Sequence, residues 1–357
     1  MKVLFVDNQV KGHHYEYMRE LACSREYQSV MILPEKVELP EDISQYVFNE
    51  DIEKRNYIGY YRFLKYVKAI ADIEKVDTIH FLSFDPLVKY FGFFLKKISN
   101  YNIICTFHHF RYSTLRNYSR RIIFSKINMG VVHTASLLEN AQKDGILNCE
   151  HIEYPVFKDY SKINCKDAKE AWNLTHISDK ILLAIGGTRF NKGVDLLISA
   201  LKTINSPFKL VIAGKEDYFK KDYIESETAT YKDDVILYLD YLSDEQVQSV
   251  MCCADIIVLP YRKEFDGASG PLGEGVLLGK CIVGPNHGSL GSIIESNHLG
   301  YTFETENVDS LTEVLDKAIN NDFKPDSYYK SYMNELRVST FCNKYLELYN
   351  FSNSRNG

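Results

Sequence analysis

The residues best placed to do chemistry lie in one glycine-rich stretch, residues 261–291, which reads YRKEFDGASGPLGEGVLLGKCIVGPNHGSLG. Two carboxylates, Asp266 and Glu274, stand eight positions apart in it. The stretch begins where an apolar, strand-like run ends, and an apolar helical run starts near Leu272. A loop that leads into a helix N-terminus presents backbone N–H groups and the positive end of the helix dipole, which suits a phosphate. The alternative is a glycine-rich turn that binds no ligand.

Basic residues crowd a second region. From Pro86 to Leu138 the sequence holds eight basic residues and no acidic one: Lys89, Lys96, Lys97, Arg111, Arg116, Arg120, Arg121 and Lys126. Aromatic residues, Phe91, Phe93 and Phe94 among them, are interleaved with this set. Such a pattern is typical of a face that meets an anionic membrane surface or an anionic acceptor. The alternative is a basic face that is only solvated.

The elements that must position these residues alternate along the chain. Short apolar runs such as KVLFVDN (2–8) and DTIHFLS (77–83) alternate with helical patterns, for example residues 86–98, which predicts parallel sheets covered by helices. A polar stretch without a strand, residues 158–178, divides two such series, and we interpret it as a linker. We therefore expect two Rossmann-like α/β domains whose strand ends face a ligand cleft.

The remaining strand-like runs are short and rich in Val, Ile and Leu, as strands buried on both faces should be. In the first series they cover residues 102–110, 129–134 and 149–157, and in the second residues 180–187, 208–214, 234–242, 254–261 and 280–286.

Composition bounds the remaining classes. The 357 residues carry a formal net charge of −6, which gives no overall nucleic-acid signature. The eight cysteines form no Cys-x-x-Cys pair and mostly lie in apolar runs, so we expect reduced thiols and neither a disulfide framework nor a zinc site. The N-terminus turns polar too early for a secretory signal, and no apolar run approaches a membrane span. These features predict a cytoplasmic protein.

The motifs resemble those of the GT4 family of retaining glycosyltransferases. The family signature is Glu, seven residues and Glu, with a glycine after the first acid and a proline three before the second; DGASGPLGE matches it with Asp in first place. The stretches ILLAIGGTRFNKGVDLLISALK, VILYLDYLSDEQVQSVMCCADIIVLPY and VSTFCNKYLELYN are also similar. The resemblance implies the GT-B architecture. Its domains would be residues 1–160 with a returning C-terminal helix at about 335–357, and residues 178–334 for the donor.

The resemblance also implies roles for single residues. Glu274 would accept hydrogen bonds from the ribose hydroxyls, and Asp266 would face the transferred sugar. Lys192, in FNKGVD, would neutralise the diphosphate, and His108 would lie next to the reacting sugar. The backbone of Gly270, Pro271 and Leu272 would hold sugar or phosphate oxygens. The alternatives are an exposed helical Glu, a solvated Lys and a histidine that faces the core.

Two parts of the site are less legible. The family carries Arg five residues before the Lys, but this sequence has Gly187 there, with Arg189 as the nearest substitute and Arg262 as a second candidate. Base recognition is expected near Tyr241 and Leu242, through backbone groups.

At the position of the family's acceptor loop stand Gly12, His13 and His14. The two histidines could orient an acceptor hydroxyl or a phosphate. The alternative is that they are exposed residues at a helix start.

The sequence therefore predicts an enzyme that moves a sugar from a nucleotide diphosphate sugar to a glycan or lipid-linked acceptor in surface polysaccharide synthesis. No Asp-x-Asp occurs in the chain, so we expect neither a metal nor another cofactor, and we expect peripheral binding at the inner face of the plasma membrane through residues 86–126. Two alternatives stay open. One is a nucleotide-sugar epimerase or phosphorylase of the same fold, and the other is a non-catalytic subunit that binds sugar nucleotides.

Overall fold

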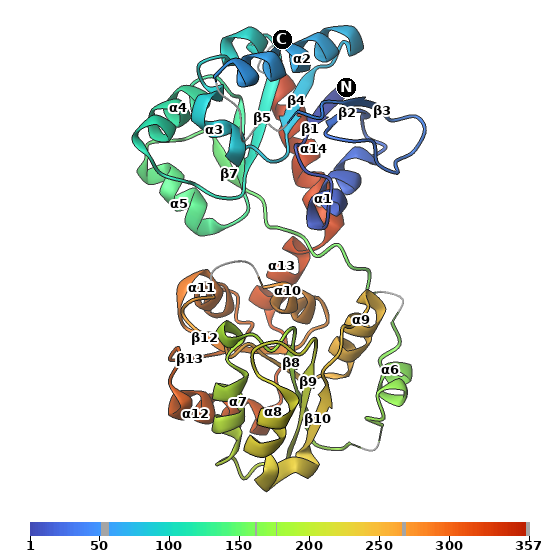
Figure 1. Ribbon diagram of the computed structural model, residues 1–357, viewed down its shortest axis with the longest axis vertical. Coiled ribbons are helices and arrows are strands. Elements are labelled where there is room, and N and C mark those ends of the chain that lie inside the picture. The colour runs from blue at the N-terminus through green and yellow to red at the C-terminus, as the bar shows by residue number, and fades with distance from the viewer. Residues whose placement is uncertain (51–56, 161–162, 176, 266–268, 355–357) are drawn as a thin grey trace. The chain divides into compact units, whose positions relative to one another are not determined.

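The chain folds into two compact units, one formed by residues 1–157 and 337–357 and the other by residues 158–336. The computed structural model describes residues 1–357 except 51–56, 161–162, 176, 266–268 and 355–357. Each unit contains one parallel sheet flanked by helices (Figure 1). The predicted pair of Rossmann-like domains is thereby confirmed.

The sheet of the first unit has the strand order β3-β2-β1-β4-β5-β6-β7. Its strands are β1 (Lys2–Val6), β2 (Gln28–Leu33), β3 (Ser44–Val47), β4 (Thr78–Phe81), β5 (Asn102–Phe107), β6 (Met129–Val132) and β7 (Cys149–His151). Its helices are α1 (His13–Ala22), α2 (Tyr57–Glu74), α3 (Val88–Phe91), α4 (Thr114–Phe124), α5 (Ala135–Lys143) and α14 (Val338–Ser354). The order reverses between β1 and β4, the place where doubly wound sheets bind ligands at their strand ends.

Alternate residues of β1 enter different cores. Leu4 and Val6 pack with α2, whereas Val3 and Phe5 pack with α1 and α14. Successive side chains of a strand point to opposite faces, so both faces of this sheet are buried. This explains why β1 is apolar from Val3 to Val6 instead of alternating apolar with polar residues.

The returning helix α14 is held to the first unit by a buried polar chain as well as by apolar packing. The hydroxyl groups of Tyr17 and Tyr345 lie 2.5 Å apart, and Thr106 Oγ1 lies 3.0 Å from Tyr345. His80 joins this chain through Tyr349, at 2.7 Å, and Thr106, at 3.0 Å. Figure 1 shows α14, in red, against the strands of this unit. The predicted helix that returns to the first domain is confirmed.

The sheet of the second unit has the order β10-β9-β8-β11-β12-β13. Its strands are β8 (Lys180–Ile185), β9 (Phe208–Ala213), β10 (Val235–Tyr238), β11 (Ile256–Val258), β12 (Cys281–Pro285) and β13 (Gly300–Phe303). Its helices are α6 (Cys165–Ala171), α7 (Val194–Leu201), α8 (Lys221–Glu227), α9 (Asp244–Cys253), α10 (Gly270–Leu277), α11 (Gly288–Ser296), α12 (Val308–Asn320) and α13 (Ser327–Glu335). Here the order reverses between β8 and β11, which again marks a ligand-binding edge.

The structure differs from the predicted single helix over residues 86–98. It forms instead a 3-10 turn at Asp85–Leu87, the short helix α3 and a second 3-10 turn at Leu95–Ile98. Gly92 lies where α3 ends, and α4 packs so closely there that a Cβ atom on Gly92 would come within 2.7 Å of the Ser119 carbonyl oxygen. The glycine weakens the helix and permits this close packing.

The polar segment 158–178, which the sequence led us to interpret as a linker, contributes to the second unit. It contains α6, which packs on α9, and Trp172 Nε1 donates a hydrogen bond to Ser249 Oγ at 3.0 Å. The segment contains no strand among its described residues, yet it is fixed to the second unit by these contacts.

Candidate functional site

Glu274 lies in α10, inside the glycine-rich stretch 261–291. Glu274 is only 9% exposed, and each of its carboxylate oxygens has a polar partner. Oε1 lies 3.2 Å from Lys158 Nζ, and Oε2 accepts a hydrogen bond from the Tyr160 hydroxyl. A Cβ atom on Gly270 would lie 3.5 Å from Oε1, so glycine keeps the space beside this oxygen open. A buried carboxylate with directed partners is an acceptor for hydroxyl groups.

The N-terminus of α10 offers fewer backbone donors than its sequence suggests. Pro271 has no N–H group, and the Leu272 N–H donates to the Ser269 carbonyl at 3.1 Å. Among the described residues the Gly270 N–H has no hydrogen-bond acceptor, which distinguishes it from the N–H group of Leu272. Asp266, the first acid of the motif, lies outside the described residues.

Lys192 lies at the end of the 3-10 turn Phe190–Lys192, which follows β8. It is 9% exposed, and its ammonium group lies over two aromatic rings, 3.7 Å from the ring centre of Tyr261 and 4.2 Å from that of Phe265. Burial, and then the nearby charge of Arg189, lower the pKa of Lys192 to about 7. A buried cation whose neighbours are aromatic faces is suited to receive an anionic ligand.

The two candidate arginines have different surroundings. The guanidinium group of Arg262 is paired with Asp195 at 2.5 Å and stacks over Phe190 at 4.1 Å, so its charge is already neutralised. Arg189 is exposed, and its charge contributes to the lowered pKa of Lys192. The structure thus brings Arg189 together with Lys192 and places Arg262 in an ion pair.

The remaining predicted donor residues lie after two strands of the same sheet, β8 and β10. Gly187 follows β8, and a Cβ atom there would lie 3.4 Å from the Lys215 carbonyl oxygen. Tyr241 and Leu242 lie between β10 and α9, and Tyr241 is 83% exposed. These positions share the carboxyl edge of the sheet with Lys192, because parallel strands end on one side.

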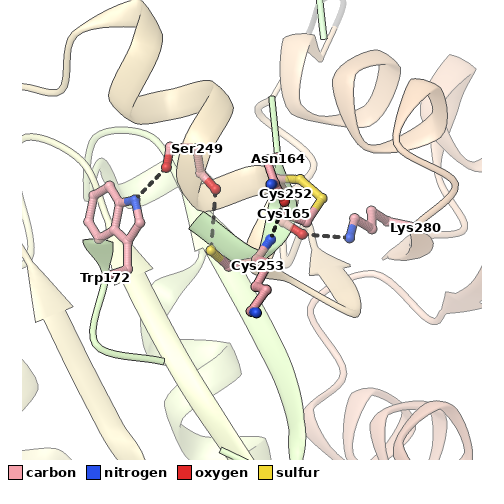
Figure 2. Close-up of a disulfide and its surroundings, with 8 residues drawn as sticks. Asn164, Cys165, Trp172, Ser249, Cys252, Cys253 and Lys280 are labelled. Carbon is pink, nitrogen blue, oxygen red and sulfur yellow. Dashed lines mark hydrogen bonds between the residues drawn. A yellow bond between two sulfur atoms is a disulfide. The ribbon is translucent and has the colours of Figure 1, made fainter. Parts of the chain in front are cut away.

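The expectation that all thiols are reduced is wrong for two cysteines. Cys165, at the start of α6, forms a disulfide with Cys252 near the end of α9 (Figure 2). Lys280, which follows α10, donates a hydrogen bond to the Cys252 carbonyl at 2.8 Å. The partners are 87 residues apart and carry no motif, so the sequence offered no signal for this pairing.

His108 follows β5 in the first unit. Its Nε2 lies 3.2 Å from the Leu82 carbonyl oxygen, so that nitrogen carries a proton, and its backbone N–H donates to Asp85 at 2.9 Å. Its ring centre lies 5.8 Å from that of His14 and 5.2 Å from that of His133. Three histidines from different elements therefore meet at the carboxyl edge of this sheet.

The acceptor residues predicted from the sequence lie at the start of α1. Gly12 precedes the helix with φ of +59°, and His13 is the first residue of α1. His14 Nδ1 lies 3.9 Å from Asp7 Oδ2. A Cβ atom on Gly12 would meet no atom within 4 Å, so this glycine serves the backbone conformation instead of close packing.

Sequence reasoning missed Asp7, His133 and Tyr17. Asp7 directly follows β1 and is 5% exposed; burial raises its pKa to about 7, although the backbone N–H groups of Gln9 and Asn8 oppose this. Burial, and then His108, lower the pKa of His133 to about 3, so this ring is neutral. An acid at the end of the first buried strand was the one signal available for Asp7.

The basic stretch divides into exposed and buried residues. Lys96, Lys97 and Arg121 are exposed, as is Phe93 at 38%. Arg120 is 4% exposed and paired with Asp144 at 2.8 Å, so it does not belong to a surface face as the sequence suggested. Among the described residues, no helix is long and apolar enough to cross a membrane.

The part of the sequence that matches a known protein family lies within the second unit. Residues 167–335, within the second unit, match the family model described as Glycosyl transferases group 1. An uncharacterized glycosyltransferase of Methanocaldococcus jannaschii, MJ1178, is 33% identical over 140 residues, which cover 39% of this chain and 38% of that protein. The glycogen synthase of Pseudomonas syringae pv. syringae is 23% identical over 158 residues, 44% of this chain and 32% of that protein. The chain thus spans less than half the length of these relatives.

Solved structures are similar over nearly the whole chain. A glycosyltransferase from Rickettsia africae superposes with a TM-score of 0.76 at 17% identity and covers 98% of both chains. Anabaena Alr3699/HepE, solved in complex with UDP, gives a TM-score of 0.69 at 15% identity over 97% of this chain and 99% of that one. At such identities the likeness identifies the fold, which is that of the GT-B glycosyltransferases.

Proposed function

We propose that the protein is a retaining glycosyltransferase of the GT4 type, which moves a sugar from a nucleotide diphosphate sugar to a glycan or lipid-linked acceptor in surface polysaccharide synthesis. The observation that carries the proposal is the anchored carboxylate of Glu274 in α10, inside the region that matches the group 1 family model. A ribose diol needs such an acceptor. The relatives named as glycosyltransferases support the same reaction class.

The donor is bound by opposite charges in separate places. Glu274 accepts hydrogen bonds from the ribose hydroxyls, while Lys192 and Arg189 face the diphosphate. The leaving group carries negative charge that grows as the glycosidic bond breaks, so fixed cations stabilise the transition state more than the ground state. Asp266 is assigned to the sugar and His108 to the reacting centre on the resemblance alone.

The two cations take the place that a divalent ion holds in other transferases, so we propose a reaction without metal. The bond between the anomeric carbon of the sugar and the diphosphate oxygen breaks, and a bond to the acceptor oxygen forms. The nucleoside diphosphate is the leaving group and takes up the proton of the acceptor hydroxyl. Activity that survives EDTA supports this part of the proposal. Complete loss on EDTA treatment, restored by manganese, overturns it without affecting the assignment of Glu274.

The first unit is proposed to bind the acceptor through Gly12, His13 and His14, in the cytoplasm at the inner face of the plasma membrane. The exposed residues Lys96, Lys97 and Arg121 would each contribute about 1 kcal/mol near an anionic bilayer. Changing all three to Gln should weaken salt-sensitive binding to phosphatidylserine vesicles about 100-fold. The exposed lysines 220, 221 and 232, changed together to Gln, form the matched control. No vesicle binding by the unaltered protein at low salt would contradict this location.

The activity itself is tested by incubating the purified protein with a panel of nucleotide sugars and, separately, with free sugar phosphates. Release of nucleoside diphosphate from one donor, faster when an acceptor glycan is added, supports the transferase. Turnover of free sugar phosphate supports a phosphorylase, and an altered sugar on an intact nucleotide supports an epimerase. Binding without any turnover leaves the non-catalytic subunit.

A further inference from the structure

The Glu274 carboxylate is held by a segment that the sequence motif does not include. Lys158 Nζ lies 3.2 Å from Oε1, and the Tyr160 hydroxyl donates to Oε2. These partners precede Glu274 by 116 and 114 residues. Each oxygen thus has one defined donor, and these two donors fix the rotation of the carboxylate plane.

Lys158 joins two carboxylates. Besides Glu274, it contacts Asp244 Oδ1 at 3.2 Å, at the first residue of α9. Burial lowers the pKa of Lys158, but the charges and hydrogen bonds of Glu274 and Asp244 outweigh it and raise this pKa above its usual value. The bridge therefore stays charged, and it links the starts of α9 and α10.

Tyr160 is a donor that stays protonated. Burial, followed by the neighbouring Glu274 charge, raises its pKa far above the usual range. A neutral hydroxyl next to a carboxylate adds a hydrogen bond without cancelling the negative charge. The carboxylate keeps its capacity to accept further hydrogen bonds.

The segment that carries both donors is anchored to α9. Asn164 caps α6 by accepting the Lys166 N–H, and Cys165 is bonded to Cys252. Figure 2 shows this disulfide beside the hydrogen bond from Trp172 to Ser249. The disulfide and the Trp172 hydrogen bond therefore both hold α6 and its C-terminal end against α9. Lys158 and Tyr160 precede this anchored helix in the chain.

We propose that Lys158 and Tyr160 are positioning residues that set the selectivity of this site for ribose. An ionised carboxylate has about four lone-pair sites, and these two donors occupy two of them. Two sites remain, which matches the two hydroxyls of a ribose diol. Because the acceptor is oriented before the ligand arrives, less rotamer freedom is lost on binding. This inference rests on the proposed donor role of Glu274.

The test measures the ratio of affinities for ribonucleotides and deoxyribonucleotides. ADP, GDP and UDP, each beside its 2′-deoxy counterpart, are titrated into the full chain by calorimetry. In Tyr160→Phe and Lys158→Met the preference for ribose should fall about three- to tenfold, while the affinity for the deoxy forms stays within twofold. Lys158→Arg should restore much of the preference. Tyr231→Phe, which removes a hydroxyl bonded to the Ile198 carbonyl, is the matched control and should change nothing.

The outcomes separate this inference from the proposed function. An unchanged ribose preference in both variants overturns the positioning role and leaves the donor site in place. A higher ribonucleotide affinity in Tyr160→Phe also overturns it, because Tyr160 would then compete with the ligand. If the unaltered protein binds none of the six nucleotides, the proposed donor site fails and the inference fails with it.

Discussion

The carboxyl edges of the two sheets differ in whether their buried ionisable groups are paired with opposite charges or shifted toward their neutral forms. In the second unit Glu274 is paired with Lys158, and Arg262 is paired with Asp195. In the first unit burial raises the pKa of Asp7 to about 7 and lowers that of His133 to about 3. One edge holds formed charges in fixed pairs, and the other holds groups that favour their neutral forms.

This difference fits two kinds of ligand. A nucleoside diphosphate carries several negative charges, so its site needs cations that are already oriented. An acceptor hydroxyl is neutral, and neutral imidazoles can both donate to it and accept from it. Lys192 combines both properties. It lies at the carboxyl edge of the second sheet, where the charges are paired, but burial lowers its pKa to about 7.

The largest effect should come from breaking the disulfide between Cys165 and Cys252 in the second unit. Cys165→Ser removes a disulfide that spans 87 residues, and loops of this size contribute about 2–5 kcal/mol to the free energy of unfolding. Denaturant unfolding should show that loss in the second unit alone, and dithiothreitol should bring the unaltered protein to the same stability. Cys253→Ser, at a free buried thiol on the same helix, should stay sensitive to the reductant. Unfolding that is indifferent to dithiothreitol would contradict the disulfide.

The next effect concerns the pH dependence of nucleotide binding. Since burial lowers the pKa of Lys192 to about 7, the free protein loses this cation as pH rises above 7. The proposed diphosphate ligand would bind the charged form, so its affinity should fall up to about tenfold per pH unit between pH 7 and 9, about 1.4 kcal/mol each. Calorimetry in two buffers should show proton uptake on binding. Lys192→Met should bind weakly with little pH dependence, and the same slope in this variant would assign the titration elsewhere.

The third effect should appear in the first unit. The pKa of Asp7 is raised from 3.8 to about 7, so between these values the folded protein binds a proton that the unfolded chain has released. Stability therefore falls as pH rises through this window. Asp7→Asn keeps the oxygen that accepts the Gln9 N–H and should remove this loss, which is at most about 4 kcal/mol between pH 4 and pH 8. Thermal unfolding at both values checks this, with the exposed Asp42→Asn as the control. A gain of equal size in the control would contradict the assignment of this pH dependence to the raised pKa of Asp7.

The strands that could be predicted are those with long apolar runs, such as 180–187 and 208–214, because burial on both faces demands Val, Ile and Leu. β3 and β13 were not predicted, since SQYV and GYTF are short and partly polar. β2 reads QSVMIL and had an apolar signal that was overlooked.

For the candidate site, sequence spacing pointed to Glu274 but not to its partners. Lys158 and Tyr160 lie in a polar segment more than a hundred residues away, and only the folded chain brings them to α10. Arg120 was predicted to be exposed because it is charged, but its partner Asp144 allows it to be buried. Long-range pairing of this kind leaves no local pattern.

The most direct test of the donor site is the affinity of Glu274→Gln for the nucleoside diphosphate that binds the unaltered protein most tightly. Gln keeps the volume of the side chain and removes its charge. The account predicts a loss of about 1.5–3 kcal/mol, the usual contribution of hydrogen bonds to a charged group, while the free energy of unfolding of the first unit stays the same. An unchanged affinity for the nucleoside diphosphate would contradict it.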